Sequence, residues 1–375
     1  IPDGGVVIDL SQMKQIKAFR PDDLYAVVQP GLITIELDQL AAQHGLMYPP
    51  DPSSWESSTL GGNIATNAGG PRAVKYGVTH RYVWGLEMVL GDGRIFKTGR
   101  QSIKGVAGYD LSSLFVGSEG TLGFITEATL YLVPRPPAVE TAWLCFESPQ
   151  AASDATSKVF SSGFMPCMVE MVDAASLEVV RPFSSFAIPE GIGAALLIEM
   201  DGAQDQAMED LLRLCEVAVD AGAHDTLIAQ NEKTREGIRR ARRLVSGCLK
   251  EKYPHKLSDD IAVPRSRMSE LLVRSAEEAQ NHGMKFCAYG HMGDGNLHVN
   301  LLCSKETRPQ AELCRRRIME IAIEMGGTIS GEHGIGTAKR DYLPMEQGQA
   351  LIDFQKELKS VFDPQGIMNP NKIFR

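Results

Sequence analysis

The sequence lacks the cysteine spacings and apolar runs that mark several protein classes. None of its seven cysteines forms a CxxC pair, and the count is odd, which argues against a disulfide framework, a zinc ribbon or a cysteine-ligated iron–sulfur cluster. No apolar run approaches the roughly 20 residues of a membrane-spanning helix, and the first residues do not read as a signal peptide. We therefore expect a cytoplasmic protein with no transmembrane segment, in which the cysteines are small buried hydrophobes.

A surplus of basic residues is also missing. The chain has 38 lysines and arginines against 47 aspartates and glutamates, and its formal net charge is -9. Such a surface does not attract nucleic acid, and an anionic substrate would need a local basic pocket. With 375 residues, of which 43% are hydrophobic and 23% charged, the composition suits a soluble protein of two or three domains.

A proline cluster, Val133-Pro134-Arg135-Pro136-Pro137, predicts a domain boundary at residue 135, because it can continue neither a strand nor a helix. Before it the chain is rich in glycine, and we expect a helix at 35–44 and strands at 6–10, 27–31, 83–90 and 124–133. After it we expect strands at 194–200 and 286–290 and helices at 147–162, 205–222, 234–252 and 310–325. Strands and helices without strict alternation predict an α+β fold for this second part.

Two glycine-rich segments, residues 57–70 and 116–123, carry few large polar side chains. Glycine lets a backbone N–H approach a phosphate or a flat ring, and it also suits tight surface turns. Composition alone does not choose between these two interpretations. Neither segment has the GxxxxGK[ST] or GxGxxG pattern, so a P-loop or a Rossmann site is not predicted.

Three histidines and a glutamate lie in two further glycine-framed segments. His291 and His298 flank a Gly-Asp-Gly turn, and Glu332 and His333 follow Gly331. Two imidazoles and a carboxylate suit a divalent transition metal with open coordination positions, although histidines satisfied within the core are the alternative. In a regular strand His298 and Asn300 would point to the same face.

Five arginines cluster in residues 234–243. A helix cannot turn all of them towards one small ligand, so we expect most to form a solvated face and one to reach a carboxylate. The net charge and the absence of interleaved aromatic residues argue against nucleic-acid binding. The clustered arginines are Arg235, Arg239, Arg240, Arg242 and Arg243.

Several motifs together resemble the vanillyl-alcohol-oxidase-type flavoproteins, within the branch of glycolate oxidase catalytic subunits, D-lactate dehydrogenases and D-2-hydroxyglutarate dehydrogenases. The resemblance covers nearly the whole chain. The motifs are Pro49-Pro50-Asp51-Pro52-Ser53, Ser58-Thr59-Leu60-Gly61-Gly62-Asn63, Asn67-Ala68-Gly69-Gly70, Lys75-Tyr76-Gly77, Gly117-Ser118-Glu119-Gly120-Thr121-Leu122-Gly123 and the closing Asp363-Pro364-Gln365-Gly366-Ile367-Met368-Asn369-Pro370.

The resemblance implies an FAD-binding domain at 1–135, an α+β substrate domain with an antiparallel sheet, flanking helices and a metal site at 136–330, and a segment at 331–375 that returns to the flavin. The family's glycine-rich pyrophosphate loop would precede Ile1, so we expect the flavin domain to be truncated and to hold FAD weakly. The implied FAD-binding residues are Pro50, Ser58, Thr59, Gly61, Gly62, Asn63, Asn67, Gly69, Gly70, Gly77, Glu119, Gly120, Gly123, Ile125 and Asn369.

The resemblance also implies FAD- and metal-dependent oxidation of a D-2-hydroxy acid to a 2-oxo acid, with hydride transfer to flavin N5. His333 would be the base, and Zn, Mn, Fe or Co would bind His291, His298 and Glu332. Arg243, Lys256 and Asn300 would bind the substrate. Electrons would pass to oxygen, a quinone, a flavoprotein or an iron–sulfur partner subunit, and such a partner could associate the protein with a membrane. A flavin-free metal-dependent hydrolase and an inactive fragment are the alternatives.

Overall fold

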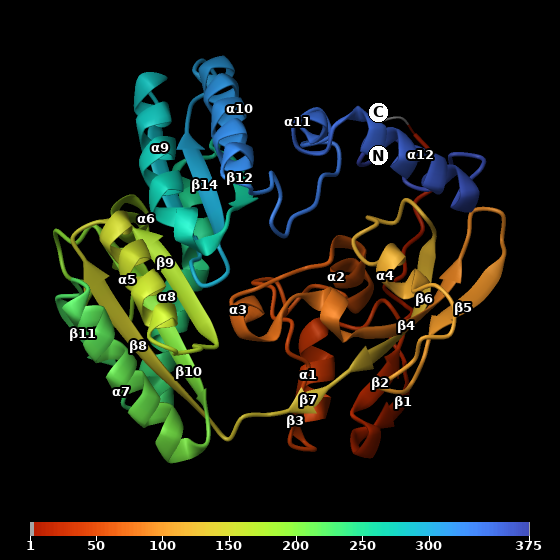
Figure 1. Cartoon of the computed structure of the whole chain (residues 1–375), viewed down its shortest axis with the longest axis horizontal. Coiled ribbons are helices and arrows are strands. Elements are labelled where there is room, and N and C mark those ends of the chain that lie inside the picture. Colours follow the sequence, from red (N-terminus) through yellow and green to blue (C-terminus); the bar gives the residue numbers. More distant parts are fainter. Residues whose placement is uncertain (1–3, 375) are drawn as a thin grey trace. The chain divides into compact units, whose positions relative to one another are not determined.

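The computed structural model describes residues 4–374 and divides the chain into two compact units (Figure 1). The first unit contains the residues up to Gly70, Gly77–Arg135 and the residues from Glu332 onward. The second unit contains the short segment Pro71–Tyr76 and the long stretch Pro136–Gly331. The first unit is therefore built from both ends of the chain, whereas the second is nearly continuous in sequence.

The first unit is organised around an antiparallel sheet in the order β1-β2-β6-β4-β5. β4 and β5 form a hairpin in which Gly93 takes a φ of 86°, a conformation that glycine adopts without strain. A second, two-stranded ladder joins β3 and β7. The strands are β1 (Ile16–Arg20), β2 (Tyr25–Val28), β3 (Leu46–Met47), β4 (Val83–Val89), β5 (Ile95–Gly99), β6 (Phe124–Tyr131) and β7 (Val133–Pro134).

Short helices connect these strands, and the C-terminal segment adds two more. Phe362, from the last of these helices, packs edge-on against Phe115 with ring centroids 5.2 Å apart, so this segment contributes to the core of the first unit. The helices are α1 (Thr34–Ala42), α2 (Leu60–Thr66), α4 (Leu111–Phe115), α11 (Leu343–Gln347) and α12 (Gln349–Phe362), with 3-10 turns at Pro21–Asp23 and Thr79–Tyr82.

The second unit contains one antiparallel sheet in the order β11-β8-β10-β9-β13-β14-β12. Its central strands are buried along almost their whole length because helices cover both faces. The strands are β8 (Ala138–Phe146), β9 (Met168–Asp173), β10 (Ala194–Gly202), β11 (Asp225–Ile228), β12 (Leu257–Ala262), β13 (Lys285–His291) and β14 (Asn296–Leu302).

Two hydrophobic clusters fill the two sides of this sheet. Four helices contribute to one cluster, namely α5 (Pro149–Ser161), α7 (Gln204–Asp220), α9 (Met268–Asn281) and α10 (Arg308–Glu324). The other cluster lies under α6 (Ala174–Val180) and α8 (Glu232–Lys252). The one-turn α3 (Ala73–Tyr76) and 3-10 turns at Arg181–Phe183 and Arg265–Arg267 complete the unit.

The predicted α+β class is confirmed, and every helix expected from the sequence is present with shifts of one to a few residues at its ends. The strand predicted at 6–10 is wrong. Val6 and Val7 are exposed, and this run has no ladder partner among the described residues. An apolar run without a neighbouring strand has no partners for its backbone groups and does not form a strand.

Candidate functional site

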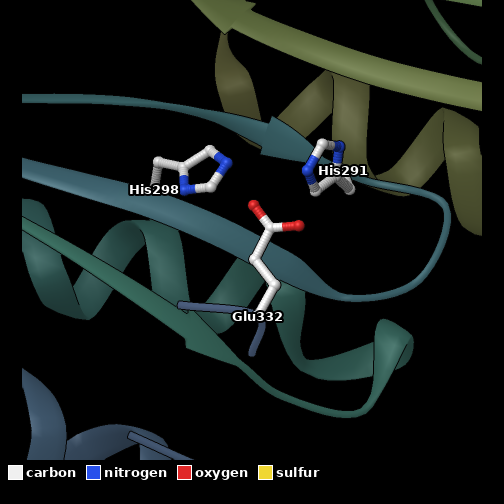
Figure 2. Close-up of side chains that lie close together, drawn as sticks. All are labelled: His291, His298 and Glu332. Atoms are coloured by element: carbon white, nitrogen blue, oxygen red, sulfur yellow. The ribbon is translucent and has the colours of Figure 1, made fainter. Parts of the chain in front are cut away.

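The structure brings His291, His298 and Glu332 together, and their ligand atoms all lie within 4.8 Å of one another. His291 ends β13 and His298 lies on the neighbouring β14, and both are buried. Figure 2 shows the Glu332 carboxylate pointing towards both rings. Glu332 directly follows Gly331, which belongs to the same unit as the two histidines. Among residues 4–374 this is the one such group, and its donor set fits a divalent transition metal.

The buried carboxylate of Glu170 contacts the Nδ1 nitrogen of the His291 ring. Glu170 lies opposite His291 in the β9–β13 ladder, and its Oε1 is hydrogen-bonded to His291 Nδ1. Its other oxygen lies 2.7 Å from Arg242 Nη2, as an ion pair outside hydrogen-bond geometry. Burial alone would raise the pKa of Glu170, but the charge of Arg242 and the hydrogen bond from His291 outweigh burial and hold the pKa below its ordinary value. Glu170 is therefore an anion at neutral pH.

A second buried carboxylate fixes the chain just before Glu332. Asp260 on β12 accepts hydrogen bonds from Gly331 N at 2.9 Å, Ser330 Oγ at 3.0 Å and Asn296 Nδ2 at 2.9 Å. A Cβ at Gly331 would lie 2.2 Å from Asn296 Nδ2 and 2.7 Å from Asp260 Oδ1, so only glycine fits here. The backbone directly before Glu332 is therefore fixed by hydrogen bonds.

His333 is in contact with the same group but is much more open. Its Nε2 lies 3.4 Å from Glu332 Oε1, and its side chain is 62% exposed. The residues after it are held by Glu119, whose carboxylate accepts hydrogen bonds from Ile335 N at 2.7 Å and Gly336 N at 2.8 Å. An accessible imidazole on a held loop can exchange a proton with a bound molecule.

Two of the three predicted substrate residues lie together on the face of the sheet that carries His298. Asn300 is fully buried, and Lys256 Nζ donates to its Oδ1 at 2.8 Å. Ser258 also donates to this oxygen, at 2.6 Å. Burial lowers the pKa of Lys256. A half-buried ammonium bonded to Asn300, which lies two residues from His298 on β14, suits an anionic group of a ligand.

The third, Arg243, is partly exposed on α8 and pairs with Glu236 of the same helix. Its neighbour Arg242 instead turns to the sheet and meets Glu170. Adjacent residues on a helix point about 100° apart, so the two arginines occupy different environments. A role for Arg243 in binding substrate stays a prediction.

The expectation that most of the clustered arginines form a solvated face is wrong. Arg235, Arg239 and Arg242 each pair with a glutamate of a different strand, because their spacing puts them on one side of α8. The partners are Glu140 on β8, Glu199 on β10 and Glu170 on β9.

The two glycine-rich segments, far apart in sequence, meet in the first unit. Gly117 N donates to Ile64 O at 2.9 Å, and Glu119 N donates to Ala65 O at 2.8 Å. Asn369 of the closing motif joins them through Nδ2, which donates to Glu119 O at 2.7 Å. Because the three motifs form one connected loop surface, they fit a cradle for a large cofactor better than they fit separate surface turns.

Many of the residues predicted to bind FAD have a structural task in this cradle. Thr59 caps α2 by accepting from Gly62 N. Asn63 is buried and donates to Thr34 Oγ1 at 2.7 Å. Five of them have positive φ, namely Asn67, Gly77, Glu119, Gly120 and Asn369. Gly61 and Gly70 pack against the backbone of Pro30 and Asp51, and Ser58 lies 3.0 Å from Thr34 Oγ1. Pro50, Gly69, Gly123 and Ile125 are buried.

The sequence analysis did not assign Glu170, Asp260 or Arg242 to the site. Glu170 contacts His291, Asp260 holds the backbone before Glu332, and Arg242 pairs with Glu170. For Arg242 a signal exists, because residues 235, 239 and 242 recur on one helical face. For the two carboxylates the only cue is an acidic residue within an otherwise apolar strand. Such a residue must find a partner when buried.

The sequence matches two domain families. The family described as "FAD linked oxidases, C-terminal domain" matches residues 135–373, and the "FAD binding domain" family matches residues 1–99. No helix in the described part of the chain is both long and apolar enough to cross a membrane.

Curated relatives match over almost the whole chain. The glycolate oxidase subunit GlcD of Bacillus subtilis is 40% identical, over 99% of this chain and 80% of that protein. A D-lactate dehydrogenase of Anaerostipes hadrus is 36% identical over 99% and 80%. A D-2-hydroxyglutarate dehydrogenase of Stutzerimonas stutzeri is 35% identical over 99% and 82%.

Solved structures share the fold at low identity. p-Cresol methylhydroxylase with substrate bound superposes with a TM-score of 0.76 at 16% identity, over 99% of this chain and 80% of that chain. An alkyldihydroxyacetonephosphate synthase superposes with a TM-score of 0.72 at 19% identity, over 96% of this chain and 67% of that chain. These similarities confirm the expected vanillyl-alcohol-oxidase-type fold and carry no further conclusion. The two domain families agree with the matches to curated relatives over nearly the whole chain, and this chain belongs to the FAD-linked oxidases.

Proposed function

We propose that this protein oxidises a D-2-hydroxy acid of the glycolate, D-lactate or D-2-hydroxyglutarate class to the 2-oxo acid, with FAD and a divalent metal ion. One observation carries the proposal: His291, His298 and Glu332 converge in a member of the FAD-linked oxidases. Its relatives are named for the oxidation of glycolate, D-lactate and D-2-hydroxyglutarate. The match to an FAD-binding domain favours this reaction over a flavin-free hydrolase.

The residues of the first unit would hold the flavin. When bound, FAD supplies the hydride acceptor that no amino-acid side chain can provide. The loop surface made by residues 57–70, residues 116–123 and Asn369 offers backbone close enough for a flat ring or a phosphate. Gly69 borders Glu332 in this unit, since a Cβ there would lie 3.1 Å from Glu332 Oε2. This proximity supports a shared role of the glycine-rich loops and the metal ligand.

His291, His298 and Glu332 would bind Zn, Mn, Fe or Co. A divalent ion at this position polarises a hydroxyl group and lowers its pKa. Glu170 would hold the His291 ring, and Asp260 would hold the backbone directly before Glu332. Three protein ligands leave coordination positions for a substrate, as expected of a catalytic site.

His333 would then take the hydroxyl proton onto an imidazole nitrogen. In the same reaction the hydrogen on carbon 2 leaves with its electron pair, and the carbon becomes the carbonyl of the 2-oxo acid. His333 is accessible and adjacent to Glu332, and an imidazole is the most frequent general base in enzymes. Lys256 and Asn300 would orient the substrate carboxylate, with Arg243 as a further candidate.

The electrons must leave the protein after each turnover. We propose oxygen, a quinone, another flavoprotein or an iron–sulfur partner subunit as the acceptor. Adding each acceptor in turn to the reduced enzyme and measuring the rate of flavin reoxidation would identify it.

The test is anaerobic mixing of the FAD-loaded protein with glycolate, with each enantiomer of lactate and with each enantiomer of 2-hydroxyglutarate. We expect bleaching of the oxidised flavin absorbance with glycolate or with a D-enantiomer, and none with the L-enantiomers. Reduction by L-enantiomers at an equal rate, or no reduction by any 2-hydroxy acid, would contradict the proposal.

A further inference from the structure

We propose that Glu170 is a positioning residue that fixes the tautomer and orientation of His291, so that the ring presents Nε2 to the metal. This inference rests on the proposed metal site. It concerns a residue of β9 that touches neither substrate nor flavin in the proposed reaction. Its position in the sheet and its two contacts carry the argument.

The ladder dictates the contact between Glu170 and His291. The two residues are directly paired across β9 and β13, so their side chains leave the same face of the sheet. Glu170 has no exposed surface, and its Oε1 is bonded to His291 Nδ1. The Arg242 guanidinium pairs with the other oxygen of Glu170, so Glu170 meets His291 as a carboxylate acceptor and Nδ1 is the donor. The lone pair of the neutral ring is then on Nε2.

Arg242 fixes Glu170 from the other side. Its guanidinium lies 2.7 Å from Glu170 Oε2, and its side chain is 8% exposed. The guanidinium carbon also lies 4.9 Å from the ring centroid of Tyr289, the residue opposite His298 in the β13–β14 ladder. The carboxylate is therefore gripped at both oxygens. A rotation of Glu170 that released His291 would also separate two buried charges.

The chain offers an internal comparison. Glu199 on β10 is as deeply buried as Glu170, and both of its carboxylate oxygens accept hydrogen bonds from Arg239. Glu199 also accepts a hydrogen bond from Thr141 Oγ1 at 2.8 Å. Glu170 and Glu199 thus share burial, strand context and an α8 arginine. They differ in one respect, because only Glu170 contacts a predicted metal ligand. If Glu170 had a purely structural role, replacing it should have the same effect as replacing Glu199.

The experiment compares E170Q with E199Q in the full chain. The tautomer of each histidine is read from long-range proton–nitrogen NMR spectra of the metal-free protein, with H291N used to assign the His291 signals. The affinity for Zn²⁺ alone is measured by competition with a chelating dye. A glutamine amide can donate to Nδ1 as well as accept from it, so the E170Q ring is free to take either tautomer.

We expect His291 to be protonated at Nδ1 in the wild type and in E199Q, and to show a mixture or the other tautomer in E170Q. We expect Zn²⁺ to bind E170Q about 10–100-fold more weakly than the wild type, the usual loss for a residue that orients a metal ligand. E199Q should bind Zn²⁺ like the wild type. If E170Q does not fold, the double variant E170Q/R242M removes both charges and should show the same two effects.

An unchanged His291 tautomer in E170Q overturns the inference, and so does an equal loss of Zn²⁺ affinity in E199Q. If the wild type binds no Zn²⁺, Mn²⁺ or Co²⁺, the metal site itself fails. If the wild type binds metal and E170Q binds it equally well, only the positioning role of Glu170 fails.

Discussion

Replacing Asp260 should loosen the segment that presents Glu332. Asp260 is fully buried, and in D260A the amide of Gly331 and one hydrogen of the Asn296 amide lose their acceptor. Hydrogen bonds to a charged group contribute about 1.5–3 kcal/mol each, so two of them amount to about 3–6 kcal/mol. The hydroxyl of Ser330 can rotate to another partner and is left out of this sum.

D260N should be much milder. The amide oxygen can still accept from Gly331 and Asn296, and the Ser330 hydroxyl can accept from the new amide instead of donating. Only the charge is lost. Since charge-assisted hydrogen bonds are roughly twice as strong as neutral ones, we expect about half the destabilisation of D260A.

Hydrogen exchange of the β12 amides, followed by mass spectrometry, measures this loss in the second unit alone. A two-unit chain does not give one defined free energy of unfolding. D259N is the control, because Asp259 is a neighbouring buried carboxylate that pairs with Arg315. D259N should lower protection without lowering Zn²⁺ affinity, whereas D260A should lower both. Wild-type Zn²⁺ affinity in D260A, or D260N as damaging as D260A, would refute this reasoning.

Three further predictions concern the metal, the histidines and the pH. Exhaustive chelation should abolish flavin reduction by substrate, and a divalent metal should restore it; full activity in a sample shown by elemental analysis to be metal-free would oppose this. H333A should reduce the rate of flavin reduction by about 10²–10⁴-fold and keep its metal, whereas H298A should lose both; metal loss in H333A would reverse the assignment. Burial raises the pKa of Asp173 to about 6 despite its hydrogen bonds from Ser176 and Ala288. The native state then binds this proton more tightly than the unfolded chain, so stability should fall as pH rises from about 4 to about 6. D173N should flatten that slope in hydrogen-exchange measurements of the second unit, and an unchanged slope would count against the raised pKa.

The sequence predicts the regular elements well where one periodicity dominates. Residues 204–220 and 232–252 have apolar residues at helical spacing over several turns, and both form helices. The run at 6–10 has strand composition but no neighbour, and the structure gives it no strand. Pairing between distant segments, rather than local preference, decides such short runs.

The sequence predicts the three central residues of the candidate site but not the residues that hold them in place. His291, His298 and Glu332 stand out because glycines frame them. Glu170 and Asp260 lie inside buried strands, and their importance appears only when the sheet order places β9 beside β13 and β12 beside β14. Likewise, local composition suggested a solvated α8, whereas the carboxylates that bind its arginines come from three other strands.

The division of the first unit between both ends of the chain has a consequence for biosynthesis. Its residues up to Arg135 leave the ribosome early, but the partners of Glu119 and Phe115 lie beyond residue 331. At about 5–20 residues per second, the whole second unit is translated before those partners appear. The second unit can therefore fold on the ribosome while the glycine-rich loops still lack Ile335, Gly336 and Asn369. A flavin that needs the finished cradle can be captured only after Asn369 has been translated.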